Sequence, residues 1–77
     1  MQLGLYKHYK GNPYNLMGVA RHSESLEEMV VYQAMYGDYR LWVRPKELFF
    51  GTLMVDGQEV PRFTFVDETL TQTPLIR

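Results

Sequence analysis

The sequence contains no cysteine, and it has only 77 residues. The absence of cysteine excludes disulfide bonds, a zinc site built on thiolates and a thiol nucleophile. A chain of this length has room for one hydrophobic core, and a domain of about this size hides only about 60% of its unfolded surface on folding. Packing alone must therefore hold the fold together, and we expect one small domain.

Long apolar runs and a strong net charge are also missing. No stretch approaches the roughly 18 apolar residues that span a bilayer, and the first residues lack the apolar run of a signal peptide. We therefore expect a cytoplasmic protein with no membrane partner. Eight Lys and Arg residues nearly balance nine Asp and Glu residues, which gives a net charge of −1 and no global field to attract nucleic acid. The charges are uneven along the chain, because residues 1–22 carry only bases and residues 23–38 only acids.

Turn residues divide the chain into short segments that are rich in β-branched and aromatic side chains. The turn signals are Gly11-Asn12-Pro13, Gly37-Asp38 and Asp56-Gly57, since Gly, Asn and Asp accept the positive φ of tight turns. Strands are predicted at 5–10, 14–21, 29–36, 39–44, 52–55 and 58–65. Short strands at this spacing are typical of a mainly β fold, either a small barrel or a strongly bent antiparallel sheet.

Two segments have the character of short helical turns. Ser25-Leu26-Glu27-Glu28 forms a capping box, which predicts one helical turn followed by a strand. The alternative is a longer helix from Ser25 to about Met35, because short apolar runs fit either element. Pro45 to Phe49 is predicted as the second turn, since proline suits a first helical position.

The end of the chain has weak patterning after Phe65. We therefore place a single domain at residues 1–66 and a loosely ordered tail at residues 67–77. Leu75 and Ile76 are the side chains that would pin this tail to the domain.

The Gly37-Asp38 turn also predicts which side chains share a face of the sheet. A two-residue loop pairs Tyr36 with Tyr39 and fixes the register of the two strands. One face is then almost wholly apolar and is expected to build the core: Val30, Tyr32, Ala34, Tyr36, Tyr39, Leu41 and Val43. The other face is mixed: Val31, Gln33, Met35, Arg40, Trp42 and Arg44. The only tryptophan is therefore predicted to lie away from the core.

The mixed face is the best candidate for a binding surface. Trp42 lies there between two arginines, and flat rings with guanidinium groups suit stacking on bases, clamping of phosphate or carboxylate, and anchoring of a peptide. The alternative is that Trp42 fills the outer side of a barrel wall while the arginine stems cover it. The predicted ligand-binding residues are Trp42, Arg40, Arg44, Arg62, Gln33 and Met35.

A second candidate site is polar and consists of His8, His22, Ser23 and Glu24. Such residues would serve a small hydrolase or a metal-dependent enzyme. Neighbouring side chains of an extended chain point to opposite faces, so His22 does not reach Ser23 unless the backbone turns. The His-Glu-x-x-His spacing of zinc enzymes is absent, and Ser23 or Ser25 is more simply explained as a turn cap. We therefore expect no catalytic residue, no metal and no cofactor.

A third interpretation is a structural or regulatory partner that works by dimerising. The acidic stretch of residues 24–38 in one chain would then meet basic residues of another chain, and salt would weaken the contact. On this basis the chain is expected to be a monomer or a weak dimer.

Six blocks of sequence occur in the order seen in a known family. They are Tyr6-Lys7-His8-Tyr9-Lys10-Gly11-Asn12, Ala20-Arg21-His22-Ser23-Glu24, Val30-Val31-Tyr32, Tyr36-Gly37-Asp38, Trp42-Val43-Arg44-Pro45 and Arg62-Phe63. On these blocks, residues 4–65 resemble the bacterial domain-of-unknown-function 1653 family. The chain differs mildly at Ser25, where the family usually has Thr, and at Lys46 and Leu48, where Leu and Met are common.

The resemblance implies a small, mostly β bacterial domain similar to SH3-like barrels, and it implies no activity. SH3-like barrels bind extended ligands, because a groove of rings needs little rearrangement to receive them. The sequence therefore predicts a small binding module that engages a peptide or a single-stranded nucleic acid through its aromatic and basic face.

Overall fold

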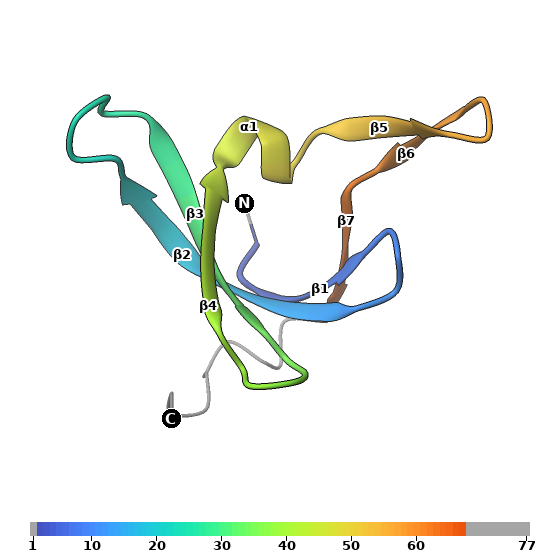
Figure 1. The fold of residues 1–77 in the computed structure, drawn as a ribbon, viewed down its shortest axis with the longest axis horizontal. Coiled ribbons are helices and arrows are strands. Elements are labelled where there is room, and N and C mark those ends of the chain that lie inside the picture. The colour runs from blue at the N-terminus through green and yellow to red at the C-terminus, as the bar shows by residue number, and fades with distance from the viewer. Residues whose placement is uncertain (1, 68–77) are drawn as a thin grey trace.

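Seven strands and one short helix make up residues 2–67, the part of the chain that the computed structural model describes (Figure 1). β1 (Gly4–His8), β2 (Pro13–Arg21), β3 (Glu28–Ala34) and β4 (Leu41–Pro45) pair in chain order, and β7 (Phe63–Asp67) pairs with β1. All these pairs are antiparallel, which gives a sheet of order β4-β3-β2-β1-β7. Between β4 and β7 lie α1 (Lys46–Phe49) and a hairpin of β5 (Thr52–Val55) and β6 (Gln58–Pro61). The predicted mainly β class is confirmed.

The sheet is strongly bent, but it does not close into a barrel. Its two edges, β4 and β7, do not pair with each other within residues 2–67. Tyr32 of β3 nevertheless contacts Phe63 of β7, with 5.6 Å between ring centroids, although two strands lie between them. A flat sheet would hold these two strands about 14 Å apart, because neighbouring strands lie roughly 4.8 Å apart. The bent sheet is therefore the correct form of the two predicted, and the closed SH3-like barrel is wrong.

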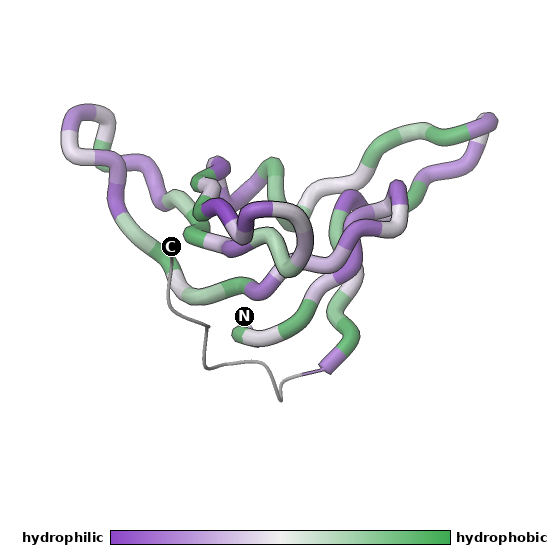
Figure 2. The backbone as a smooth tube through the Cα atoms, turned by 60° about the horizontal axis from the view of Figure 1, so that its bottom comes forward, coloured by the Kyte–Doolittle hydropathy of each residue, from purple (hydrophilic) through white to green (hydrophobic). Residues whose placement is uncertain are grey.

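The core lies on the concave side of this sheet. Its buried side chains come from four strands and α1: Tyr6, Leu16, Val30, Tyr32, Phe49 and Phe63. Phe49 stacks on Phe63 with 4.0 Å between ring centroids and 7° between ring planes. α1 therefore covers the concave side through one aromatic side chain. Figure 2 shows short hydrophobic and hydrophilic stretches following one another along the backbone.

The register of β3 and β4 differs by one residue from the predicted pairing. Tyr32 lies opposite Trp42, and Val30 lies opposite Arg44. The connection between the two strands spans residues 35–40, so it is longer than the two-residue turn that Gly37-Asp38 predicts. A slip of one residue moves every side chain of a strand to its other face. Trp42 and Arg44 therefore lie on the concave side, and their predicted position on the opposite face is wrong.

The predicted core face is correct for β3 only. Val30, Tyr32 and Ala34 are buried, as expected. The remaining members are exposed, because they belong to the long connection or to the other face of β4: Tyr36, Tyr39, Leu41 and Val43.

The predicted helical turns have different outcomes. The capping box does not form a helical turn: residues 23–25 form a turn, Leu26 has a φ of 64°, and β3 begins at Glu28. The predicted strand is therefore confirmed, whereas the helical turn at Ser25–Glu28 and the longer helix to Met35 are wrong. The Oγ of Ser25 accepts a hydrogen bond from the Glu27 amide at 3.2 Å, which confirms its role as a turn cap. The second predicted turn is α1, which Pro45 precedes as the N-cap.

The predicted strand 58–65 is divided in two at Arg62. β6 pairs only with β5 and β7 pairs with β1, so the β5–β6 hairpin leaves the sheet as an arm (Figure 1). The Arg62 amide donates to the Gly51 carbonyl at 3.0 Å, and the Arg62 carbonyl accepts from the Tyr9 amide at 2.9 Å. These two hydrogen bonds hold Arg62 between the arm and the β1–β2 connection.

The predicted tail at 67–77 lies outside the described residues, except for Asp67, which ends β7. Leu75 and Ile76 belong to the part that is not described.

Candidate binding site

Tyr14 is the centre of an aromatic cluster at the rim of the concave side. Near the start of β2, its ring contacts Tyr32 at 5.4 Å, Tyr36 at 5.6 Å and Phe63 at 5.5 Å. The His8 ring lies 6.2 Å from it. All four contacts are edge-on, the geometry that brings the positive edge of one ring to the negative face of another. The bend of the sheet thus brings together rings from β1, β2, β3, β7 and the β3–β4 connection.

Hydroxyl groups of this cluster are linked to one another and to an arginine. The hydroxyls of Tyr14 and Tyr36 are 2.6 Å apart and share a hydrogen bond, and the Nε of Arg44 donates to the Tyr32 hydroxyl at 3.3 Å. Burial and this hydrogen bond raise the pKa of Tyr14 to about 12, although Arg44 acts in the opposite direction. Tyr14 therefore keeps its proton throughout the physiological range of pH.

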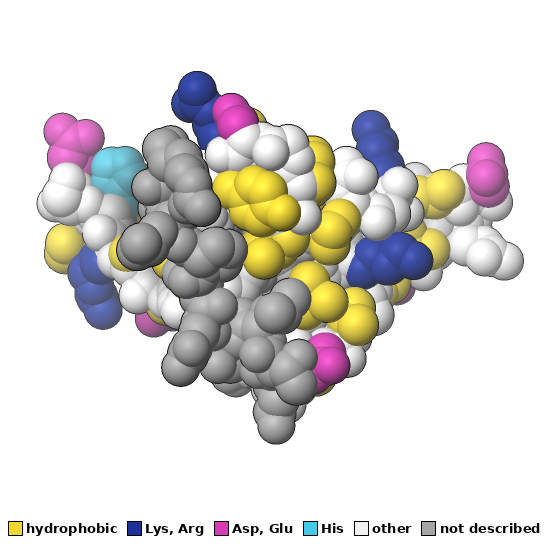
Figure 3. All heavy atoms as spheres, turned by 90° about the horizontal axis from the view of Figure 1, so that it is seen from below, with side chains coloured by type: hydrophobic (Ala, Val, Ile, Leu, Met, Phe, Trp, Pro, Cys, Tyr) yellow, Lys and Arg dark blue, Asp and Glu magenta, His cyan; other side chains and the backbone are white. Residues whose placement is uncertain are grey.

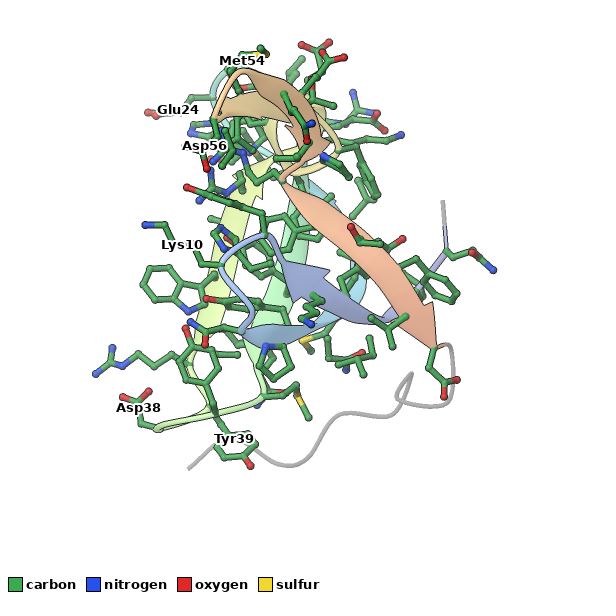
Figure 4. The ribbon with its side chains drawn as sticks, turned by 90° about the vertical axis from the view of Figure 1, so that its right-hand side faces the viewer. Lys10, Glu24, Asp38, Tyr39, Met54 and Asp56 are labelled. Carbon is green, nitrogen blue, oxygen red and sulfur yellow. The ribbon has the colours of Figure 1, made fainter. Side chains whose placement is uncertain are left out.

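Three cations lie near His8, at the end of β1. Burial lowers the pKa of His8, and the charges of Arg44, Arg62 and Lys10 lower it further. The Nε of Arg62 is buried without a hydrogen-bond partner among the described residues, so it remains an unused donor. Lys10 lies over the Tyr9 ring, 5.8 Å from its centroid, and Figure 4 shows it projecting outward from the β1–β2 connection.

Trp42 extends this surface to the β4 edge. It lies on the same face as Arg44, and it is 51% exposed. Its indole makes no ring contact with any other residue in 2–67, so it has an open face.

We name the whole surface the basic aromatic rim, and it consists of His8, Lys10, Tyr14, Tyr36, Trp42, Arg44 and Arg62. Figure 3 looks onto the end of the molecule that carries the β3–β4 connection, and it shows exposed hydrophobic side chains with Lys, Arg, Asp and Glu side chains around them.

The predicted ligand-binding residues are only partly brought together. Trp42, Arg44 and Arg62 lie in the rim. Arg40 instead forms an exposed ion pair with Asp38 at 2.9 Å, at the tip of the β3–β4 connection (Figure 4). The other two members lie elsewhere: Gln33 is fully buried on the convex face, where its Nε2 donates to the Tyr39 carbonyl, and Met35 follows the end of β3.

The residues of the predicted polar site are separated by the fold. His8 ends β1, whereas His22, Ser23 and Glu24 belong to the turn after β2, at the opposite end of the molecule in Figure 1. The Nδ1 of His22 accepts from the amides of Glu24 and Ser25 at 3.1 and 3.3 Å. The Nδ1 of His8 accepts from the Lys10 amide at 3.2 Å in the same way. Both histidines therefore stabilise turns.

Three rim residues, Lys10, Tyr14 and Tyr36, belong to neither of the two predicted sites. Tyr14 carried no signal beyond its place after a turn, and Tyr36 was assigned to the core face through the wrong register. The six tyrosines in 77 residues are the sequence feature that points to such a cluster, because a buried tyrosine hydroxyl needs a hydrogen-bond partner.

The described residues hold no cluster of three or more His, Cys, Asp or Glu side chains that could bind a metal ion. Within the same residues, no helix has the length and apolar character needed to cross a membrane.

The lowered pKa of His8 predicts a pH-dependent stability. The native state binds fewer protons than the unfolded chain between the lowered pKa and the ordinary value of 6.5, so stability rises with pH in that window. We expect the free energy of unfolding to be highest above about pH 7 and to fall on acidification below the ordinary histidine pKa. Urea denaturation at several pH values measures this dependence.

A matched variant assigns the pH effect to His8. His8→Asn keeps an acceptor near the Nδ1 position but does not titrate, so its stability should change less between about pH 5 and about pH 7 than that of the wild type. Arg62→Gln removes one of the nearby charges and should reduce the slope without abolishing it. An unchanged slope in His8→Asn would show that another group causes the effect.

Comparisons with known proteins agree with this architecture. A family model described as "Protein of unknown function (DUF1653)" matches residues 4–65. The fold is similar to the crystal structure of a protein belonging to DUF1653 from Bordetella bronchiseptica, with a TM-score of 0.80 and 31% sequence identity over 97% of this chain and 95% of that chain. None of the curated proteins compared with the chain matches it. The chain belongs to the DUF1653 family, whose function is unknown.

Proposed function

We propose that the domain binds single-stranded nucleic acid through the basic aromatic rim. The observation that carries this proposal is the meeting of a cation and an open ring at the rim: the Arg44 Nε donates to the Tyr32 hydroxyl at 3.3 Å, and Tyr32 lies opposite Trp42, which is 51% exposed. Such a surface attracts an anion, because guanidinium and ammonium groups form charge-assisted hydrogen bonds with phosphate oxygens. The ligand must therefore carry negative charge.

The rings beside these cations favour a nucleotide over a simple anion. Trp42 and Tyr36 are 51% and 39% exposed, so each offers area on which a base can stack. Base stacking on an aromatic side chain contributes about 1–3 kcal/mol and tolerates any sequence. Exposed rings that alternate with cations are the arrangement that single strands require, since each nucleotide brings one base and one phosphate.

Trp42 provides a direct test, because it is the only tryptophan and its fluorescence reports on stacking. We expect a short oligothymidine to quench this fluorescence saturably. With three cations in contact, the logarithm of the affinity should fall with the logarithm of the salt concentration with a slope of about −2. With a dye-labelled oligonucleotide, Trp42→Ala should weaken binding about tenfold.

Two arginines near β4 form a matched pair of controls. Arg44→Gln removes a rim charge and should weaken binding, whereas Arg40→Gln removes a charge that Asp38 already pairs and should not. Equal effects of the two changes would contradict the assignment of the site. Saturable binding of an oligoglutamate peptide instead of the oligonucleotide would show that the rim recognises acidic peptides, and no response to either would reject the rim as a binding surface.

A further inference from the structure

The hydroxyl group of Tyr32 is held in a fixed place beneath the basic aromatic rim. Tyr32 is only 4% exposed, and its ring packs edge-on against Tyr14, Phe49 and Phe63 at centroid distances of 5.4, 5.1 and 5.6 Å. These three rings come from β2, α1 and β7. A ring enclosed from three elements of a close-packed core does not swing, so the position of its hydroxyl is set by the fold.

This hydroxyl holds the guanidinium of Arg44 through one nitrogen. The Arg44 Nε donates to it at 3.3 Å. Val30 lies opposite Arg44, so Tyr32 is its diagonal neighbour across the β3–β4 ladder, which a long side chain can reach. A guanidinium carries N–H groups on all of its nitrogens, so the bond through Nε leaves the two terminal amino groups as donors. The ion pairs within residues 2–67 engage Arg40 and Lys46 instead.

We propose that Tyr32 is a positioning residue, which holds Arg44 so that Arg44 and Trp42 together seat one nucleotide. The phosphate lies on the terminal amino groups of Arg44, and the base stacks on the indole of Trp42. This inference rests on the proposed function, because it describes the same rim in more detail.

The spacing of the two side chains fits one nucleotide. Trp42 and Arg44 are two positions apart on the same face of β4, so their Cα atoms lie about 7 Å from each other. A nucleotide joins its base to its phosphate through a single sugar, so one unit of the strand reaches both side chains. The two terminal amino groups of a guanidinium match two oxygens of a phosphate, which a single ammonium group does not.

The bond to Tyr32 raises affinity because it orders Arg44 before the ligand arrives. A long side chain loses rotamer freedom when it binds, and this loss lowers affinity unless the side chain is already held. Lys10 gives the contrast, since it lies over the Tyr9 ring at 5.8 Å and projects outward from the β1–β2 connection (Figure 4). Both cations attract phosphate, but only the held guanidinium determines where the phosphate lies relative to Trp42.

Binding of a dye-labelled oligothymidine at several salt concentrations separates positioning from charge. Tyr32→Phe keeps the ring and removes the hydroxyl, so affinity should fall about threefold to tenfold, the effect of ordering one long side chain. The salt dependence should not change, because every charge remains. Arg44→Gln should instead reduce the slope of log affinity against log salt by about 0.7.

Tyr6→Phe is the matched control for the loss of a buried hydroxyl. Tyr6 belongs to the same core and is 5% exposed, but its hydroxyl donates to the Gln2 carbonyl at 2.7 Å. This variant should lose stability in urea denaturation without losing affinity. A loss of affinity in Tyr6→Phe as large as that in Tyr32→Phe would overturn the positioning role, because general stability would then explain both.

Competition against the labelled oligothymidine tests the nucleotide seat. We expect thymidine monophosphate to compete at least about tenfold better than thymidine or inorganic phosphate, since only the nucleotide engages both side chains. A monophosphate that competes no better than inorganic phosphate would overturn the seat, because Trp42 would then add nothing.

Nuclear magnetic resonance of the free protein tests the bond without any ligand. The Arg44 Nε–H signal should exchange slowly with water in the wild type and rapidly in Tyr32→Phe. Equally rapid exchange in both would overturn the positioning role. Equal oligothymidine affinity of the wild type and Tyr32→Phe would also overturn it but leave the proposed function intact, whereas a wild type that binds no oligothymidine would reject the proposed function and the nucleotide seat together.

Discussion

Phe49→Ala is expected to destabilise the domain by about 3–5 kcal/mol. Phe49 is fully buried, and its ring contacts Phe63, Tyr6 and Tyr32 at centroid distances of 4.0, 5.5 and 5.1 Å. Truncation removes this apolar area from the core and leaves a cavity between α1 and the sheet. A domain of this size has a total stability of only about 4–12 kcal/mol, so a large part of the population should unfold.

The effect should be this large because Phe49 alone anchors α1. The helix has four residues, it lacks a side-chain cap, and no other residue of α1 is buried. Leu48→Ala is the matched control, since Leu48 is 52% exposed on the same helix and its truncation should cost less than about 0.5 kcal/mol. Urea denaturation followed by tyrosine fluorescence and far-UV circular dichroism measures both variants. Similar losses for the two would mean that helix propensity, rather than the aromatic stack, stabilises α1.

The position of most strands could be predicted from local chemistry. Gly11-Asn12-Pro13 and Asp56-Gly57 mark real turns, with φ of 107° at Gly11 and 79° at Gly57. Such residues act within three or four positions of the chain, so a single sequence reveals them. The division of 58–65 into two strands at Arg62 depends on β7 pairing with β1, a contact between distant segments.

The register of β3 and β4 could not be predicted because Tyr39 adopts an unusual conformation. Its φ of 57° lets a longer connection form where Gly37-Asp38 alone would suggest a tight hairpin. This one-residue difference decides the side of the sheet on which Trp42 lies. Trp42 is open to solvent, as the sequence indicated, but it is open because it lies at a sheet edge on the concave side, next to the core.

A pair of buried amides lies on the convex face, across the β2–β3 ladder. Asn15 of β2 lies opposite Gln33 of β3, and neither side chain is exposed. Gln33 donates through Nε2 to the Tyr39 carbonyl, but its Oε1 has no partner among the described residues. Both polar atoms of the Asn15 amide lack partners there as well. A buried polar group without a hydrogen bond costs about 1–3 kcal/mol, so the unpartnered amide of Asn15 lowers the stability of the fold.

Asn15→Leu is therefore expected to stabilise the domain by about 2 kcal/mol or more, because leucine has the branched shape of asparagine without its two polar groups. Gln33→Leu is the matched comparison and should gain less, since it also removes the bond to the Tyr39 carbonyl. Thermal denaturation of both variants decides the point, as about 1 kcal/mol shifts the midpoint by roughly 4–8 °C in a domain of this size. A lower midpoint for Asn15→Leu than for the wild type would show that the buried Asn15 amide is hydrogen-bonded in solution and stabilises the fold.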